Sequence, residues 1–482
     1  MEQFLAKLLD LVSKANAFLS DYILIVLLVG TGIFFTIATR FVQIRCFGQG
    51  LKNVFGNLSL RGGKQENGLS SFQALATAIA AQVGTGNIVG ASGAILIGGP
   101  GAIFWMWVIA FFGMATIYAE AVLAQKTRVQ NADGEIQGGP VFYIKAAFKG
   151  KFGTFLAGFF AIAITLALGF MGTMVQSNSI AESCNTAFGI DGWIIGVIIA
   201  AISAFIFLGG IKRIASVTEK LVPIMAVIFL MGGLVILICR IQNIPETFGL
   251  IFKSAFAPKA LIGGTVGMAI KTAISQGAKR GLFSNEAGMG STPHAHAMAN
   301  VKRAHDQGTT AVIGEFIDTF VVLTMTALVV ITTLFTGNGP LAGANAGTYS
   351  SMLETSGITK TNAMQFAVSS VFDQTGIQGL GNIFVAICLL FFAYSTIISW
   401  NFFGKINVQY LFKNNKIATA VYSVLALVFI VLGSLLKNDL VWELTDFFNY
   451  LMVLPNVIAL IALGKLVKEE ATAKKTAEEM VK

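Results

Sequence analysis

Charged residues are scarce in this chain of 482 residues, since Asp, Glu, Lys and Arg together make up 12% of it, about half of the ~25% typical of soluble globular proteins. Proline, with 8 residues, and cysteine, with 4, are also few. The cysteines show no CxxC or zinc-like spacing, although Cys184 and Cys239 could meet in a disulfide near the outer face. The shortage of charge excludes an ordinary soluble enzyme.

Long uncharged runs are what the sequence has instead, with 55% hydrophobic residues and 52 glycines. A run of about 18 to 25 apolar residues is long enough to cross a bilayer as a helix. Such runs lie at 21–39, 70–97, 101–124, 154–180, 192–210, 217–239, 265–299, 309–336, 381–403, 418–436 and 442–464. The sequence therefore predicts an all-α polytopic membrane protein with about 11 spans.

The net charge of +9 is unevenly distributed along the chain. The connections after the first and third runs are basic, beginning at Arg40 and Lys126, whereas the turn at 98–101 between the second and third runs carries no charge. Basic loops stay on the cytoplasmic side. We expect the cell (inner) membrane as the location, the N-terminus outside, the C-terminus in the cytoplasm, and no nucleic-acid partner. Residues 1–20 resemble an amphipathic interfacial helix rather than a signal peptide.

The second run is interrupted at its centre by a polar, glycine-rich segment made of Gly84, Thr85, Gly86 and Asn87. Unpaired backbone at membrane depth is tolerated only where it lines a cavity or a site. We interpret these residues as an unwound break in the helix. Glycines at 86, 90 and 93 could also form a small-residue face for close helix packing, and both interpretations can hold together.

The seventh run is too polar for a plain spanning helix. It contains Lys271, Lys279, Arg280 and Glu286, and the polar pair Ser284 and Asn285 lies between Gly281 and Gly288. Each such charge in lipid costs about 2.5 to 3.5 kcal/mol on insertion scales, so these groups must face protein or water. We expect a second break here. A simple Arg280–Glu286 ion pair near the cytoplasmic interface is the alternative.

A faint internal repeat relates these two runs. ATAI at 76–79 recurs as KTAI at 271–274, and the same offset aligns Gly86 with Gly281. Because the two runs cross in opposite directions, they suggest inverted repeats, which are typical of secondary transporters with a midplane site. The predicted organisation is one transporter domain: an interfacial helix and extra span at 1–66, five-helix repeats at 67–240 and 241–464, and a cytoplasmic tail at 465–482.

A helix break offers groups for both an anion and a cation. Free amides around Thr85 suit a carboxylate, and free carbonyls just before the break, at Ala80 and Val83, suit a hard cation. Hydroxyls at Ser395 and Thr396 on the ninth run could complete the cation site, although such hydroxyls often bond to their own helix. The break has no charged side chain, which favours a zwitterionic substrate.

Four long motifs resemble those of the alanine or glycine:cation symporter family, also called sodium:alanine symporters. They are QVGTGN at 82–87, GGPGAIFWMWVIAFFG at 98–113, GGPVFYI at 138–144 and KRGLFSNEAGMGS at 279–291. The resemblance covers residues from about 20 to 465. It implies a LeuT-type fold with one extra N-terminal helix, and sodium-coupled uptake of alanine, glycine or a similar small amino acid.

The resemblance also implies roles for particular residues. Amides near Thr85 and Gly86 would hold the substrate carboxylate, and Ala80, Val83, Ser395 and Thr396 would bind sodium. Further substrate contacts would come from Gln176, Ser284, Asn285 and Trp400. By their bulk, Phe170, Met174, Phe283 and Trp400 could close the pocket around a methyl group, or could equally be ordinary core packing. Alternatively, Gln176 makes an interhelical hydrogen bond and Trp400 lies in an interfacial belt. We expect no organic cofactor.

Two rival functions remain open at this stage. Glu315 and Asp318 lie on one face of the eighth run and, with Glu120, could carry protons; the simpler interpretation is that they form structural ion pairs with Lys279, Arg280 or Lys302. A membrane-embedded enzyme would need paired catalytic groups, which the spacing does not provide.

We also expect the loop at 337–380 to form a lid with a short helix. The sequence leaves open alanine versus glycine, sodium stoichiometry and oligomeric state.

Overall fold

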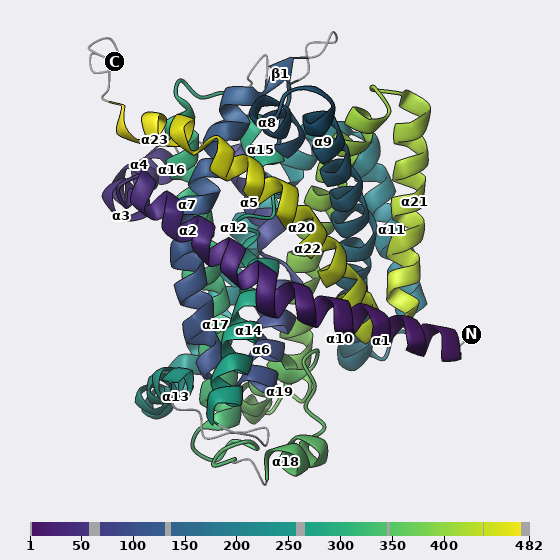
Figure 1. Ribbon diagram of the computed structural model, residues 1–482. Helices are drawn as coiled ribbons and strands as arrows, with labels where there is room; N and C mark the ends of the chain where they lie inside the picture. The colour runs from purple at the N-terminus through teal and green to yellow at the C-terminus, as the bar shows by residue number, and fades with distance from the viewer. Residues whose placement is uncertain are drawn as a thin grey trace.

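The computed structural model describes residues 2–56, 68–130, 136–256, 266–344, 348–436 and 438–473. Nearly all of these residues are helical (Figure 1). The strands among them are β1 (Val129–Gln130) and β2 (Ile136–Gln137), which pair antiparallel with Val129 opposite Gln137. The predicted all-α polytopic class is therefore confirmed.

The N-terminal segment forms one long helix, in which α1 (Glu2–Phe18) continues through a π-turn, η1 (Leu19–Leu24), into α2 (Ile25–Ala38). The sequence predicts an interfacial segment at 1–20 followed by a span, and the structure joins the two without a break, since Phe18 and Ile25 at the ends of η1 both have helical backbone angles. The helix runs obliquely across the outside of the bundle (Figure 1). Two short helices follow, α3 (Val42–Arg45) and α4 (Phe47–Phe55).

The next part of the chain contains the first interrupted helix. Ser70 starts it with a capping box, since its hydroxyl accepts from the Gln73 amide and the Gln73 side chain accepts from the Ser70 amide, both at 3.1 Å. The elements are α5 (Ser71–Gln82), η2 (Gly86–Gly90), α6 (Ala91–Gly98), α7 (Gly101–Thr127), α8 (Pro140–Ala147), α9 (Gly150–Ile164), η3 (Thr165–Gly172), α10 (Thr173–Phe188), α11 (Gly192–Leu208) and α12 (Gly210–Cys239).

The remaining part contains the second interrupted helix and the long outer loop. Its elements are η4 (Ile241–Asn243), α13 (Ile244–Phe256), α14 (Val266–Asn285), α15 (Pro293–Ala297), α16 (Ala304–Glu315), η5 (Phe316–Leu323), α17 (Thr324–Val330), η6 (Ile331–Phe335), α18 (Tyr349–Ser356), α19 (Ala363–Phe372), η7 (Asp373–Thr375), α20 (Leu380–Leu411), α21 (Lys416–Leu435), α22 (Asn438–Ala462) and α23 (Gly464–Thr472). The predicted loop helix is confirmed as α19. Tyr349, at the start of α18, donates to the Leu96 carbonyl at 2.6 Å, so this loop docks on the end of α6.

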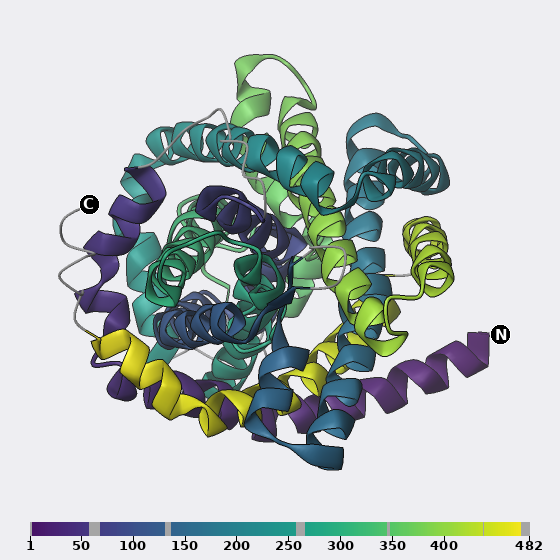
Figure 2. The ribbon, with the colours of Figure 1, turned by 90° about the horizontal axis from the view of Figure 1, so that it is seen from above.

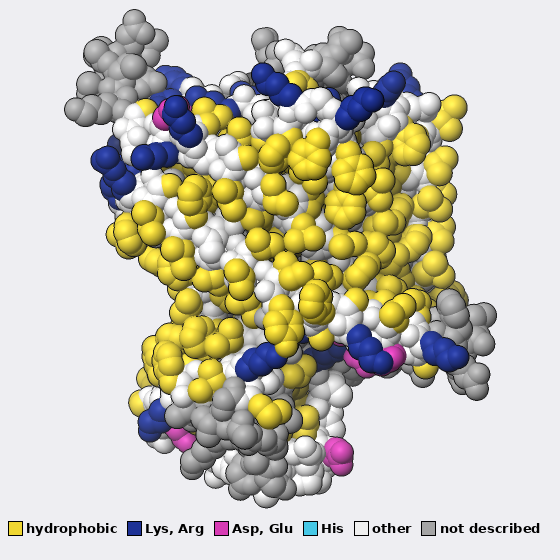
Figure 3. Space-filling model, viewed as in Figure 1, with side chains coloured by type: hydrophobic (Ala, Val, Ile, Leu, Met, Phe, Trp, Pro, Cys, Tyr) yellow, Lys and Arg dark blue, Asp and Glu magenta, His cyan; other side chains and the backbone are white. Residues whose placement is uncertain are grey.

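Eight of the described helices are long and apolar enough to span a membrane, and the bent pair formed by α5 and η2–α6 is a ninth. Helix α11 is apolar but has 17 residues, and α14 carries the predicted charges. The number of about 11 spans stays a prediction. On the face seen in Figure 3, hydrophobic side chains cover a broad band, and Lys and Arg gather above and below it.

The segment with the first break lies inside the bundle. Residues 74 to 96 are buried throughout, and the view from above shows this part of the chain enclosed by the other helices (Figure 2). A β-bridge ties its start to the second interrupted segment, since the Asn300 amide donates to the Leu69 carbonyl at 2.8 Å. All four cysteines are free, so the disulfide considered between Cys184 and Cys239 is absent.

Candidate functional site

The first break lies where the sequence predicts it. Helix α5 ends at Gln82, Val83 leaves the helical path with ψ 85°, and the chain resumes at Gly86 with a bend of 46°. The amide of Gly84 donates to the Asn87 side chain at 3.0 Å. A Cβ at Gly84 would collide with the hydroxyl of Thr396 and lie 3.1 Å from the Gln176 side chain. Only glycine fits at this position, which brings α5, α10 and α20 together.

Gln176 of α10 forms a hydrogen bond with the first break. This is the interhelical bond that the sequence offers as the alternative to a substrate contact. The Gln176 side-chain oxygen accepts from the Thr85 amide at 3.1 Å. The Asn87 amide donates to the Gly84 carbonyl at 3.2 Å. The amides of Thr85 and Asn87 therefore have protein partners in this structure, while the Thr85 hydroxyl is buried without one in the described part of the chain.

The second break directly follows Ser284 and Asn285, in the segment where the sequence predicts it. Helix α14 runs unbroken through Gly281 to Asn285, and the interruption covers residues 286 to 292, where Glu286 has a φ of 59°. The alignment of Gly86 with Gly281 therefore does not align the two breaks. Ser284 and Asn285 form the end of α14, directly before this interruption. The Asn285 side-chain nitrogen has no hydrogen-bond partner among the described residues.

The two breaks are in direct contact. A Cβ at Gly86 would lie 3.0 Å from the Ser284 Cα, so the backbones touch. Asp318, at a π-turn in η5, joins them: the Asn87 side-chain amide donates to its carboxylate at 2.7 Å and the Ser284 hydroxyl does so at 3.1 Å. Thr319 adds a third donor at 2.9 Å.

The predicted cation site brings three of its four residues together. The hydroxyls of Thr396 and Ser395 lie 2.9 and 3.2 Å from the Ala80 carbonyl oxygen. Both hydroxyls also donate to the Phe392 carbonyl of their own helix. The alternative that these hydroxyls bond to their own helix is therefore also observed. These oxygens are buried, and they supply the ligand type that a hard cation prefers. The fourth predicted ligand, Val83, directly follows the last residue of α5 and lies three positions after Ala80 in the chain.

Trp400 lies in the interior, with 1% of its surface exposed, so the interfacial-belt alternative is wrong. Its indole nitrogen donates to the Glu286 carboxylate at 2.6 Å. The Phe283 ring packs edge-on against Trp400 with ring centroids 5.9 Å apart. Phe170 is placed differently from the expectation, because its ring packs against Tyr422 and Phe429 of α21.

Four fully buried carboxylates surround the breaks: Glu120, Glu286, Glu315 and Asp318. In the described part of the chain their hydrogen-bond donors are neutral, namely amides, hydroxyls and the Trp400 indole. The expected ion pairs with Lys279, Arg280 or Lys302 are therefore wrong, as is the Arg280–Glu286 pair. Arg280 pairs with Asp446 of α22 at 3.0 Å instead. A buried carboxylate without a counter-charge is costly unless a cation or a proton neutralises it.

Sequence reasoning missed several of these partners. It treated Asp318 as a proton carrier or a structural ion pair, and it gave no role to Gln82, which donates to the Asn285 carbonyl at 2.7 Å. Two features of the sequence could have pointed to a site role: Asp318 is an acid inside an apolar run, and Gln82 directly precedes the predicted break. Neither signal identifies the contacting residue, because the partners lie more than 200 positions away in the chain.

Taken together, the buried helices, the two touching breaks and the oxygen-rich surroundings define a polytopic membrane transporter. The Sodium:alanine symporter family matches residues 5–480, and the chain belongs to this family. The resemblance identified in the motifs is thus confirmed, as is the expectation of a transporter rather than an enzyme.

Curated relatives match over nearly the whole chain. The sodium/alanine symporter AgcS of Methanococcus maripaludis is 40% identical over 96% of each chain. A putative sodium/proton-dependent alanine carrier of Bacillus subtilis, YrbD, is 38% identical over 95% of this chain and 90% of its own. A probable sodium/glutamine symporter of Bacillus subtilis, GlnT, is 36% identical over 95% and 88%. The relatives thus differ in the named amino acid and in the named ion.

Among solved structures, a manganese transporter of Eremococcus coleocola has a similar fold. It aligns with a TM-score of 0.53 and 14% identity over 89% of this chain and 94% of that one. At this identity the likeness concerns the fold alone.

Proposed function

We propose that this protein imports a small neutral amino acid, alanine or glycine, together with sodium, by alternating access. The location would be the cell inner membrane, with the N-terminus outside and the C-terminus in the cytoplasm. The observation that carries this proposal is the contact of two helix breaks next to a cluster of buried carbonyl and hydroxyl oxygens on α5 and α20. The names of AgcS and YrbD support alanine as the substrate.

The substrate would bind between the breaks. Its carboxylate would bind near Thr85 and Gly86. There a carboxylate oxygen would replace the Gln176 side-chain oxygen as the acceptor for the Thr85 amide. The unpartnered Thr85 hydroxyl and Asn285 amide supply further polar contacts, with Ser284 beside them. The rings of Phe283 and Trp400 would limit the side chain to about the size of a methyl group.

Sodium would bind at Ala80, Val83, Ser395 and Thr396, the position where carbonyl and hydroxyl oxygens converge. Here the two hydroxyls would turn their lone pairs to the ion while still donating to the Phe392 carbonyl. No charged side chain is needed for a monovalent ion held by such oxygens. The ion would fix α5, the first half of the broken helix, against α20, and the break would then be ready for the substrate.

Proton coupling through Glu315 and Asp318 is the second candidate. It is favoured by the four buried carboxylates that lack a basic partner in the described residues, and YrbD is named for both ions. The two candidates differ in a binding measurement. Sodium coupling requires that alanine affinity rises with sodium at fixed pH, whereas proton coupling requires that it rises as the pH falls without sodium.

The test is equilibrium binding of labelled alanine to the purified protein, with sodium or an equal concentration of choline. We expect binding in sodium alone, and at least tenfold weaker binding, about 1.4 kcal/mol, in Asn285→Ala with an unchanged melting temperature. Asn185→Ala, at the exposed end of α10, is the matched control and should bind like wild type. No binding in sodium would reject the function, and wild-type affinity in Asn285→Ala would reject the site.

A further inference from the structure

A cavity of about 490 Å³ lies at the end of the molecule where Figure 1 shows β1 and α15. Its walls are β2, the turn between α11 and α12, the last part of α20, and residues 68–69 just before α5. Its described lining contains none of the residues assigned to the substrate or to sodium. In the proposed orientation this end of the molecule faces the cytoplasm.

The charged residues that line this cavity are basic. Lys212 lies in the first turn of α12, and Lys405 lies in α20. Among the described residues of the lining there is no Asp or Glu. The polar lining is completed by amide side chains, those of Gln137, Asn401 and Gln409. Such a lining favours an anionic ligand.

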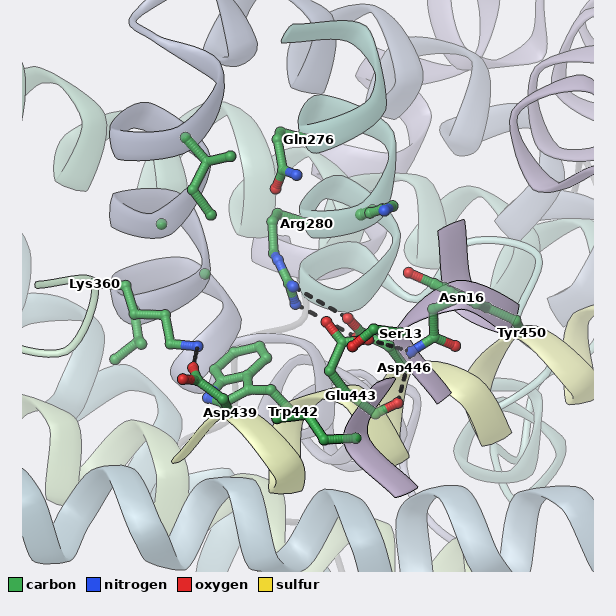
Figure 4. A pocket seen from close by; sticks show the side chains of 16 residues that line it. Ser13, Asn16, Gln276, Arg280, Lys360, Asp439, Trp442, Glu443, Asp446 and Tyr450 are labelled. Carbon is green, nitrogen blue, oxygen red and sulfur yellow. Dashed lines mark hydrogen bonds and ion pairs between the residues drawn. The ribbon is translucent and has the colours of Figure 1, made fainter. Parts of the chain in front are cut away.

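The cavity drawn in Figure 4, between α1, α6, α14 and α22, has a different charge arrangement. There Arg280 pairs with Asp446 at 3.0 Å, and Lys360 pairs with Asp439 at 2.9 Å. Two of its cations are thus neutralised by acids of the same lining. The cavity beside β2 presents its two lysines without such acids in the described part of its lining.

The N-terminus of α12 opens onto this cavity. Residues 209–212 line it, and α12 runs for 30 residues from Gly210. The first amides of a helix have no partner within their own helix, and the partial positive charge at this end favours an anion. In the described part of the chain no side chain caps this start. The amides of the first turn of α12 are therefore donors for a ligand.

A buried amide on α20 points to a ligand independently of the helix end. Asn401 lines the cavity and is 1% exposed. Its side-chain nitrogen has no hydrogen-bond partner among the described residues. A buried donor without a partner is costly. Lys405 lies four positions later on the same face of α20, so a ligand oxygen that accepts from Asn401 lies on the Lys405 side of this helix.

The position of the cavity relative to the apolar surface narrows the kind of anion. Phe205 and Leu208, at the end of α11, are 66% and 87% exposed, and the exposed Lys212 follows directly after the turn. An apolar helix end followed by a basic residue is typical of the boundary between membrane and water. Phe207 and Phe402 give the cavity an apolar wall. An anionic group attached to a carbon skeleton fits both parts.

We propose that this cavity binds a phosphate group, carried by the headgroup of an anionic phospholipid or by a soluble phosphate. The phosphate oxygens accept from the first amides of α12 and from Asn401, and Lys212 and Lys405 balance the charge. Leu69, next to the start of α5, lines the same cavity. The bound group therefore joins α12 and α20 beside the first half of the broken helix. This site is independent of the proposed function, because neither alanine nor sodium takes part in it.

The experiment measures the melting temperature of the purified full-length protein in two arms, both without alanine and sodium. In the first arm potassium phosphate replaces potassium chloride at constant ionic strength. In the second arm phosphatidylglycerol replaces phosphatidylcholine in mixed micelles. A ligand that binds the folded state raises the melting temperature, so we expect a saturable rise in at least one arm.

Three variants place the effect at the cavity. Lys212→Gln combined with Lys405→Gln should raise the half-saturating concentration at least tenfold. Asn401→Ala should raise it at least threefold, and it keeps the main-chain carbonyl that accepts from Tyr422. The matched control is Lys416→Gln, at the exposed first residue of α21, and it should behave like wild type.

The two arms also identify the source of the phosphate group. A rise with potassium phosphate that the variants weaken assigns the site to a soluble phosphate. A rise with phosphatidylglycerol alone, weakened by the same variants, assigns it to a lipid headgroup. No rise in either arm, or a rise that both the lysine pair and Asn401→Ala leave unchanged, would overturn the site.

Discussion

The side-chain amide of Gln82, the last residue of α5, donates to the backbone carbonyl of Asn285, the last residue of α14, at 2.7 Å. The same amide lies 3.3 Å from the Glu315 carboxylate. Each residue is the final one before its helix is interrupted. One side chain therefore connects the two breaks and a buried acid, so a ligand that moves either helix end must change this contact.

Removal of the Thr396 hydroxyl should raise the sodium requirement. Thr396→Val keeps the branched shape and deletes one of the oxygens that meet the Ala80 carbonyl. We expect the half-saturating sodium concentration for alanine binding to rise at least tenfold, while binding at saturating sodium is retained. The measurement is a sodium titration at fixed alanine.

Thr333→Val is the matched control for this change. Thr333 is a buried threonine whose hydroxyl bonds only to carbonyls of its own helical segment in the structure described. It should leave the sodium titration at its wild-type position. If Thr396→Val also left it there, the oxygen cluster on α5 and α20 would not be the sodium site.

Neutralisation of Asp318 should leave sodium coupling in place. Asp318→Asn preserves the shape of the side chain but removes the charge that Asn87 and Ser284 surround. Because the proposed sodium site on α5 and α20 uses carbonyl and hydroxyl oxygens alone, we expect sodium stimulation of alanine uptake to be retained. Asp306→Asn, at the partly exposed start of α16, is the matched control and should behave as wild type. Loss of sodium stimulation in Asp318→Asn, with Asp306→Asn unchanged, would show that the charge of Asp318 takes part in coupling.

The first break could be predicted to the residue because its signal is local. Two glycines and two polar residues follow one another in the middle of an apolar run at 84–87, and Gly84 also has no room for a side chain. Such a segment is tolerated at membrane depth where it lines a site. The alternation of basic and neutral loops is similarly local. Ser395 and Thr396 were found near Ala80 only through the resemblance, since hydroxyls in a membrane helix are weak evidence alone.

The rest depends on contacts between distant parts of the chain. Arg280 finds its counter-charge at Asp446, and Glu286 finds a donor in Trp400, 114 positions away. No periodicity carries such pairings. The second break could also be placed from local residues, because α14 ends at Asn285 and Glu286 adopts a left-handed conformation there. Its partners, such as Trp400, could not be predicted.

The C-terminal helix α23 should respond to pH through Glu470. Burial raises the pKa of this carboxyl, but the hydrogen bond and charge of Lys126, with the amide of His305, lower it more, so the pKa lies below its usual 4.5. A lowered pKa contributes stability that is present above about pH 4.5 and is lost as the pH falls through the folded pKa. Glu470→Gln should therefore lower the melting temperature at pH 7, by a difference that shrinks toward zero in acid.

A second surface pair provides the control for that experiment. Asp10 and Lys14 form an ion pair at 2.7 Å, but both side chains are more than 60% exposed, and such pairs contribute little. Asp10→Asn should leave the melting temperature unchanged at both pH values. A Glu470→Gln effect of the same size at pH 7 and in acid would contradict the role of the Lys126 pair.

Accumulation of labelled alanine by vesicles that contain the purified protein tests sodium coupling most directly. One set of vesicles has an inward sodium gradient at equal pH, and the other has an inward proton gradient without sodium. We predict accumulation above the external concentration in the first set alone, with loss of accumulation when a sodium ionophore is added. Equal accumulation with and without the sodium gradient, driven by the pH gradient, would contradict the account and assign the coupling to Glu315, Asp318 or Glu120.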